Sequence, residues 1–220
     1  MTSAAVPTVT AINGSERVDG DTAHVLDHCT RLFQDRGVRL HVVQLARVSM
    51  TACGACGDCN TRTLRCDVID DVEDIVATMS RSDGVLYATP VHGFGTASLM
   101  QTFLERAGVG HLRFDRPLLN KVGGALVVAR RYAPEAVMAQ LTQNILLNRM
   151  ILAGSGFPAV LRTEGGRSPL TDVEGITALE AMVERMCQLI FFLKDTDTAG
   201  LGGGPRNERE QIMIREQLGR

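Results

Sequence analysis

Stretches typical of β-strands alternate with stretches typical of helices along most of this 220-residue chain. The clearest strand is Val122–Ala129, a continuous apolar run that suits a strand buried on both faces. Strands that alternate with helices indicate a parallel sheet that is covered by helices on both sides. The sequence therefore predicts a doubly wound α/β domain with five strands.

The expected domain covers residues 1–194, and residues 195–220 form a separate glycine-rich linker and C-terminal tail. The linker is Ala199–Pro205, and the charged stretch Arg206–Leu218 is either a helix that docks on a partner subunit or a frayed terminus. The predicted strands span residues 9–12, 40–45, 84–89, 122–129 and 150–153. The predicted helices span residues 22–35, 70–79, 134–147 and 174–193, with a further helix that begins at Thr96.

Composition excludes several classes of partner. The chain is 45% hydrophobic and 22% charged with a formal net charge of −2, so it does not attract nucleic acid or an anionic membrane electrostatically. It has no Trp and two Tyr, which leaves few surfaces on which bases could stack. No apolar run of about 18 residues predicts a membrane span, and the N-terminus lacks the pattern of a signal peptide. We therefore expect a cytoplasmic protein whose thiols stay reduced.

Four cysteines lie within fourteen residues, in the run CGACGDCNTRTLRC. Cys53, Cys56, Cys59 and Cys66 have the spacing C-x2-C-x2-C-x6-C, which can wrap four sulfurs around one soft metal centre. Three interpretations are open. The first is a [4Fe–4S] cluster, the second is a redox dithiol or an inert remnant, and the third is zinc, which more often uses two separated CxxC pairs.

The other two cysteines, Cys29 and Cys187, stand alone in helical sequence, and we expect them to be buried apolar residues.

The turn after the first strand, Gly14–Ala23, has the chemistry of a phosphate site. It lacks both the GxGxxG and the GxxxxGK[ST] motifs. It offers the hydroxyls of Ser15 and Thr22, the cation of Arg17 and the free N–H groups of a helix start, which suit a phosphate dianion. The alternative is an ordinary polar turn in which Asp21 or Thr22 caps the helix.

Four stretches together resemble the flavodoxin-like NAD(P)H-dependent FMN reductases. GSERVDGDTA resembles their GSxRxxGNT phosphate loop, and SDGVLYATPVHGFGTASLMQTFLERAG is similar to their third strand, flavin-ring loop and next helix. DVEGITALEAMVERM resembles their last helix. CGACGDCNTRTLRCDVIDDVEDI resembles the cysteine loop and acidic helix of the iron–sulfur flavoprotein branch. The resemblance covers residues 8–193 and implies a flavodoxin-like three-layer sandwich with a five-stranded parallel sheet.

The resemblance also implies where FMN binds. The cofactor would lie at the carboxyl ends of the strands, with its phosphate held by Ser15, Arg17, Thr22 and the Ala23 amide. Asp21 stands where the family usually has Asn, and His92 stands where the family commonly has Tyr. His92 is a candidate catalytic residue that could donate a hydrogen bond, and it could equally be merely exposed. The residues implied along the flavin ring are Pro90, Val91, His92, Gly93, Phe94, Gly95, Ala129 and Arg130, followed by Arg131 and Tyr132.

The activity that the resemblance implies is an FMN-dependent oxidoreductase. It would move electrons between NAD(P)H or a ferredoxin-like donor and a small acceptor such as a quinone or nitro compound. A [4Fe–4S] cluster on the four cysteines is expected beside the flavin, and the chain is expected to form a homodimer or homotetramer. The alternatives are a cluster-free NAD(P)H:FMN or quinone reductase and a non-enzymatic electron-transfer or redox-sensing flavoprotein.

Overall fold

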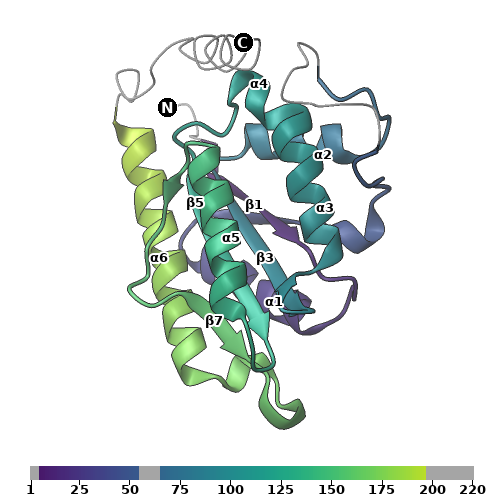
Figure 1. Ribbon diagram of the computed structural model, residues 1–220. Coiled ribbons are helices and arrows are strands. Elements are labelled where there is room, and N and C mark those ends of the chain that lie inside the picture. The colour runs from purple at the N-terminus through teal and green to yellow at the C-terminus, as the bar shows by residue number, and fades with distance from the viewer. Residues whose placement is uncertain (1–4, 55–64, 197–220) are drawn as a thin grey trace, which may run out of the picture.

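The computed structural model describes residues 5–54 and 65–196, and in this part a parallel sheet lies between two layers of helices (Figure 1). The strand order is β2-β1-β3-β5, and both β6 and β7 pair with the outer edge of β5. Five parallel positions in this order form a flavodoxin-like doubly wound sheet, as the sequence predicts. The strands are β1 (Thr8–Asn13), β2 (Arg39–Gln44), β3 (Gly84–His92), β4 (Gly95–Thr96), β5 (Val122–Ala129), β6 (Ile151–Leu152) and β7 (Ala159–Arg162).

Helices cover both faces of the sheet because each strand buries apolar side chains on both sides. One core cluster joins the sheet to α1 and α6, and the other joins it to α2, α3 and α5. Val122–Ala129 is buried along its whole length, which confirms the prediction made for this run. The helices are α1 (Asp21–Asp35), α2 (Val72–Arg81), α3 (Ser98–Ala107), α4 (Arg113–Asp115), α5 (Pro134–Leu147) and α6 (Val173–Asp195), with a π-helical turn η2 (Gly108–Leu112) between α3 and α4.

The fifth strand differs from the prediction of residues 150–153. Only Ile151–Leu152 pairs there, with the first residues of β5, and the sequence analysis missed β7, which pairs with Leu126–Ala129. Two glycines and Pro158 lie between the two short strands. Because glycine weakens a strand and proline cannot donate to the ladder, the edge position is divided into two pieces.

The predicted loop Pro90–Gly95 is a β-hairpin. β3 runs on to His92, which pairs with Gly95 of β4, and only Gly93 and Phe94 form the turn. Both turn residues have positive φ, 52° and 64°, as a two-residue type I′ hairpin requires. The reason for the error is that a strand can continue through Pro90 here. Pro90 pairs with Val128 of β5, but the pairing of β1 with β3 ends at Ala88, so β3 has a partner on one side only and a missing N–H is tolerated.

Other local predictions have mixed outcomes. Gly37 ends the first helix with a φ of +73°, and Cys29 and Cys187 are buried, both as expected. Neither Asp21 nor Thr22 caps α1, because the N-cap is Gly20. The tail beyond residue 196 and the predicted ligands Cys56 and Cys59 lie outside the described residues.

Candidate functional site

The turn between β1 and α1 is held rigidly at the carboxyl edge of the sheet. The Gly14 amide donates to the Ala88 carbonyl at 2.8 Å, and the Ser15 amide donates to Asn13 Oδ1 at 3.0 Å. A side chain at Gly14 would lie 2.5 Å from Cβ of Met100, so only glycine fits where β1 passes α3. The start of the predicted phosphate loop is therefore fixed through the amides of Gly14 and Ser15.

The predicted phosphate ligands follow in the same turn. Ser15 and Thr22 are buried. Ser15 Oγ accepts a hydrogen bond from the Arg17 amide at 3.1 Å. Arg17 itself is exposed. The Ala23 amide donates to the Gly20 carbonyl at 2.9 Å as the first bond of α1, so a phosphate would have to share that donor.

Two aromatic rings stand at the other end of this edge. Phe94 is 72% exposed in the hairpin turn, and Tyr132 is 64% exposed after β5. Their ring centroids are 6.3 Å apart with an interplanar angle of 36°, and the Arg131 guanidinium lies 5.9 Å from the Tyr132 ring. Two large exposed aromatic side chains suit contact with a flat ligand ring.

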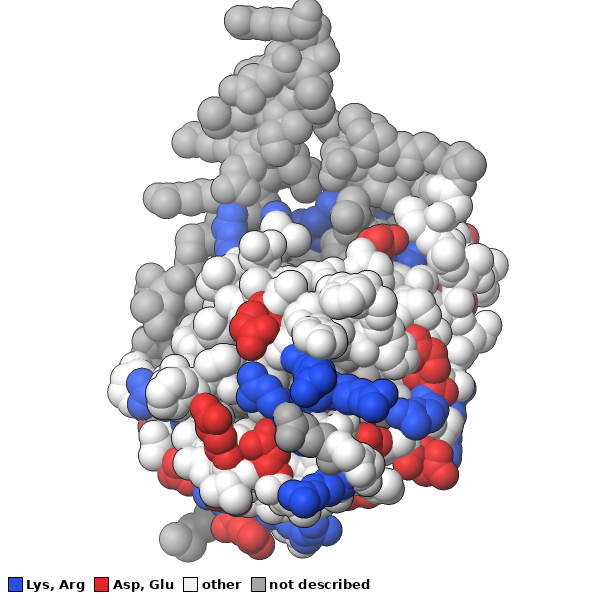
Figure 2. Space-filling view, turned by 60° about the horizontal axis from the view of Figure 1, so that its bottom comes forward, with Lys and Arg blue, Asp and Glu red and all other residues white. Residues whose placement is uncertain are grey.

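Two neighbouring cavities connect the aromatic pair to the start of α1. The first, of about 570 Å³, is lined by Val91, Gly93, Phe94, Arg130, Arg131, Tyr132 and Gly165. The second, of about 550 Å³, is lined by Asp21, His24, Arg130, Thr163, Gly165, Gly166, Arg167 and Ser168. They share Arg130 and Gly165, so they form one cleft along the carboxyl edge. Figure 2 shows basic side chains gathered across this face.

The residues present fit FMN. The cleft has the size of a cofactor site, an aromatic end for a ring and a basic end beside a helix start for a phosphate. The sequence analysis missed the contribution of residues 163–168, which include Arg167 and Ser168. The signal for this segment is the polar stretch RTEGGRS, which follows the short apolar run 159–161. It can be interpreted only when β7 is recognised, because β7 leads this segment to the carboxyl edge.

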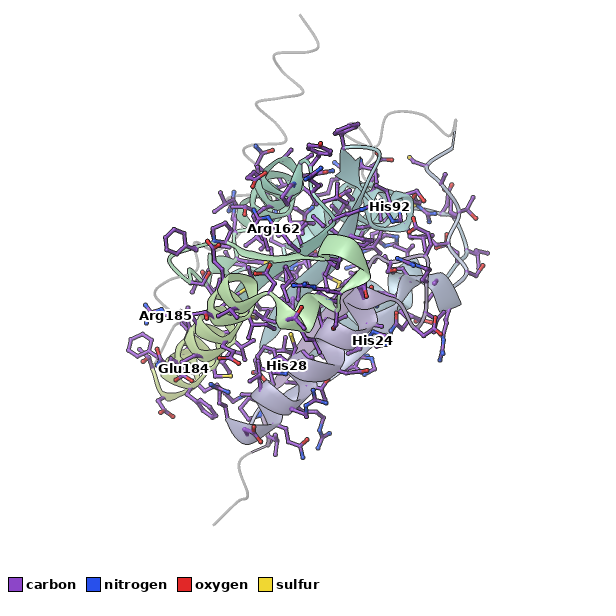
Figure 3. All side chains as sticks on the ribbon, turned by 90° about the horizontal axis from the view of Figure 1, so that it is seen from below. His24, His28, His92, Arg162, Glu184 and Arg185 are labelled. Atoms are coloured by element: carbon purple, nitrogen blue, oxygen red, sulfur yellow. The ribbon has the colours of Figure 1, made fainter. Side chains whose placement is uncertain are left out.

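Glu16 links the turn between β1 and α1 to the β3–β4 hairpin and to α3. Its carboxylate accepts hydrogen bonds from the amide and hydroxyl of Ser98, at 3.1 and 2.9 Å, and lies 3.2 Å from Nδ1 of His92. Burial raises the pKa of Glu16, but its own backbone N–H, Ser98 and His92 together hold it below its ordinary value. His92 lies at the end of β3 between Val91 and Gly93, which line the cleft, and Figure 3 shows it in a view from the carboxyl edge.

Three hydrogen bonds close the cysteine loop at its base, and a fourth attaches it to η2. Ser49 and Asp71 exchange two of them: the Ser49 amide donates to Asp71 Oδ2 at 2.6 Å, and the Asp71 amide donates to the Ser49 carbonyl at 3.0 Å. The Thr51 amide donates to Asp70 Oδ2 at 3.0 Å. The Cys66 amide donates to the Gly110 carbonyl at 2.9 Å, which attaches the returning strand of the loop to η2.

Arg106, in the last turn of α3, lies at the centre of this base. Its side chain is 1% exposed, and it forms a forked ion pair with Asp70, whose side chain is 2% exposed, at 2.7 and 3.1 Å. It also donates to the Thr51 carbonyl and lies near Cys66. Burial raises the pKa of Asp70, but the hydrogen bonds from Arg106, Thr51 and the Val72 amide hold it below its ordinary value.

His111, next to Gly110, is buried, and neither of its ring nitrogens has a hydrogen-bond partner among the described residues. Burial lowers its pKa, and Arg106 and Arg65 lower it further. Such an unpartnered polar side chain and the π-helical turn that carries it are features that concentrate at functional sites.

The loop base and the flavin cleft lie at opposite ends of α3. Ser98, at the start of the helix, binds Glu16 of the phosphate turn, whereas Cys66 is attached to η2 beyond its end. In Figure 1 the strands β3, β5 and β7 point toward the bottom and α4 lies at the top. Cys66 therefore lies away from the cleft of the same chain, and the cluster expected beside the flavin stays a prediction.

The donor set suits a soft metal centre. Cys53 is an exposed free thiol, Cys66 is half-buried, and both flank a loop whose base is closed. The described residues contain no group of three or more His, Cys, Asp or Glu side chains placed to hold a metal, but Cys56 and Cys59 lie outside that part of the chain. The residues present thus fit the [4Fe–4S] interpretation.

Comparison with known proteins identifies the family. The sequence model described as NADPH-dependent FMN reductase matches residues 7–163. The chain belongs to this family. An iron–sulfur flavoprotein of Methanocaldococcus jannaschii is 29% identical over 152 residues, which are 68% of this chain and 77% of the relative. Another, of Methanosarcina thermophila, is 26% identical over 190 residues, 84% of this chain and 96% of the relative. The chain is thus similar to iron–sulfur flavoproteins, the branch that the sequence analysis names.

Solved structures confirm the flavodoxin-like fold of this FMN reductase family member. RosB with bound 8-demethyl-8-formylriboflavin-5′-phosphate superposes with a TM-score of 0.70 at 19% identity, over 96% of this chain and 87% of RosB. FerB, an NAD(P)H:acceptor oxidoreductase flavoenzyme of Paracoccus denitrificans, gives 0.62 at 16% identity, over 85% of this chain and 98% of FerB. The chain is an FMN-containing reductase. No helix within residues 5–54 or 65–196 is both long and apolar enough to span a bilayer.

Proposed function

We propose that this reductase carries FMN in the cleft at the carboxyl edge and a [4Fe–4S] cluster on Cys53, Cys56, Cys59 and Cys66. It moves electrons between NAD(P)H or a ferredoxin-like donor and a small acceptor such as a quinone or nitro compound. The observation that supports the cluster is the closed base of the loop, where the Thr51 amide donates to Asp70 Oδ2 at 3.0 Å. Two of the four cysteines, Cys53 and Cys66, lie close to this base in the sequence. Bound FMN would supply both hydride chemistry and single-electron exchange.

The protein supplies binding and orientation. Ser15, Thr22 and the helix start provide hydroxyl and amide donors for the phosphate, and Arg130 adds a cation that both cavities share. Phe94 and Tyr132 provide an apolar contact surface at the ring end. Because these side chains are exposed and the cleft is open, a planar acceptor can approach from solvent.

His92 is a hydrogen-bonding residue at the cleft mouth in this proposal. Its Nδ1 faces Glu16, so the other ring nitrogen is the one available to a ligand. The Glu16 carboxylate fixes the orientation of the ring. The homodimer or homotetramer expected from sequence remains part of the proposal, as does a protein that carries single electrons to or from the cysteine loop.

Anaerobic purification followed by iron, sulfide and flavin analysis tests this function. We expect about four irons per chain together with FMN. The variant Cys56→Ala should lose the iron and keep the flavin, and the matched variant Cys29→Ala should keep both. Flavin without iron in the wild-type protein would contradict the cluster.

A second candidate is a cluster-free NAD(P)H-dependent reductase that works by flavin alone. The observation that favours it is the position of Cys66 at the far end of α3 from the flavin cleft. NAD(P)H oxidation with a quinone at equal rates in the wild type and in Cys56→Ala supports this candidate. If Cys56→Ala no longer exchanges electrons with a single-electron carrier, the result supports the cluster.

A further inference from the structure

Arg106 is the bulkiest side chain that the described residues bury completely. Removing a guanidinium from water is costly unless hydrogen bonds and an opposite charge compensate for it. Asp70 supplies the opposite charge through two hydrogen bonds. That pair would suffice for a purely structural role, yet the same guanidinium also lies near Cys66, whose amide is bonded to Gly110 one turn further along.

The partners of Arg106 come from both arms of the cysteine loop. Thr51, whose carbonyl accepts from Arg106, stands two residues before Cys53, and Asp70 stands four residues after Cys66. Asp70 in turn accepts from the Thr51 amide. The Arg106 side chain therefore joins the outgoing arm and the returning arm of the loop, close to Cys66. It is carried by a helix whose other end binds the turn between β1 and α1.

We propose that Arg106 is the positioning residue of the cysteine site: it fixes the Cys66 sulfur and the two arms of the loop in one arrangement and places a cation beside the fourth ligand. The proposal rests on the proposed function, because it needs the cluster. A planar guanidinium can give two parallel bonds to a carboxylate and another to a carbonyl in one fixed geometry, which the single nitrogen of an ammonium cannot reproduce. Hydrogen bonds and charge around cysteine ligands set both metal retention and reduction potential.

The first test separates geometry from charge. Arg106→Lys keeps the charge and loses the fork, so we expect iron to be lost to a chelator about tenfold faster than from the wild type. Arg36→Lys is the matched control, because Arg36 pairs with Glu184 on α6, away from the loop. This control should keep wild-type retention. Thermal unfolding of the iron-free proteins shows whether each variant folds.

The second test separates a tuning role from a purely structural one. In Asp70→Asn the cation stays beside Cys66, and in the double variant Asp70→Asn with Arg106→Gln the buried pair is neutral and the cation is gone. A nearby cation stabilises the added electron, so the double variant should have the lower midpoint potential. We expect about a tenfold smaller one-electron reduction constant, which corresponds to about 59 mV.

The outcomes are distinct. Equal chelator rates in Arg106→Lys and the wild type, or equal potentials in the single and double variants, overturn the role of Arg106 while the cluster stands. A wild-type protein that holds no iron overturns the cluster and the role together. Faster iron loss together with a lowered potential, in variants whose iron-free forms unfold cooperatively, supports the proposal.

Discussion

The two ends of α3 lie in chemically opposite surroundings. At the start of the helix, an open cleft is lined by exposed arginines, aromatic rings and glycine turns, and its charged groups meet solvent. At the end of the helix, Arg106 and Asp70 form an ion pair whose side chains are 1% and 2% exposed. The first arrangement is open to a ligand from water, whereas the second holds protein groups in place. The following variants test this contrast.

The largest effect is expected from Arg106→Met. It leaves Asp70 as an unpaired buried carboxylate, so the free energy of unfolding should fall by about 3–5 kcal/mol. Urea denaturation of the iron-free protein with FMN measures it. Arg36→Met, which breaks a partly exposed pair, should change the midpoint much less. Equal losses in the two variants would contradict the contrast between the ends of α3.

The next effect is expected from Arg130→Ala at the open end. Arg130 lines both cavities, so its loss should raise the Kd for FMN about tenfold or more, as expected for a lost charge-assisted hydrogen bond. Fluorescence titration of the flavin-free protein measures the affinity. Riboflavin, which has no phosphate, should bind both proteins alike. Arg131→Ala, which touches only the aromatic cavity, is the control and should change the FMN–riboflavin difference less.

A smaller effect of opposite sign is expected from Phe94→Asn. Phe94 has a φ of +64° and is 72% exposed, so it is strained and buries little surface. Asn tolerates this conformation better, and the flavin-free protein should gain up to about 1 kcal/mol in its free energy of unfolding. The FMN affinity should fall at the same time. A variant that loses stability would show that the ring packs more tightly than its exposure indicates.

The smallest effect concerns pH and Glu16. Because the pKa of Glu16 in the folded protein lies below its ordinary value of 4.5, its contribution to stability is present above pH 4.5. That contribution is lost as the pH falls through the lower, folded value. Glu16→Gln should therefore be slightly less stable than the wild type at pH 7, and the difference should vanish in acid. A difference independent of pH would mean that the Ser98 contacts do not depend on the charge of Glu16.

Sequence reasoning succeeds where a pattern is local. The smooth run of β5 and the Gly37 stop follow from hydropathy and backbone rules, and the structure has both. It fails where the outcome depends on a distant partner. The four residues of β7 become a strand only because the end of β5 lies free beside them, and residues 163–168 were missed with it.

The same limit applies to the sites. The glycine-, hydroxyl- and cysteine-rich motifs are contiguous, so their chemistry can be predicted from spacing. Arg106 lies 36 positions after Asp70 in the sequence, in α3, whose sequence has the pattern of an ordinary amphipathic helix. Nothing in that segment distinguishes it from a surface arginine. Only the fold shows that the helix carries this side chain under the cysteine loop.

The divided fifth strand also determines how copies of this protein can meet. Beyond β5, the sheet ends in two short strands of two and four residues, separated by glycines and by Pro158, which has no amide hydrogen. Such an edge offers no continuous row of donors and acceptors to an incoming strand. Two molecules therefore cannot extend the sheet across this side, and the chain is protected there against strand-by-strand aggregation. Self-association on this side has to use helices and loops.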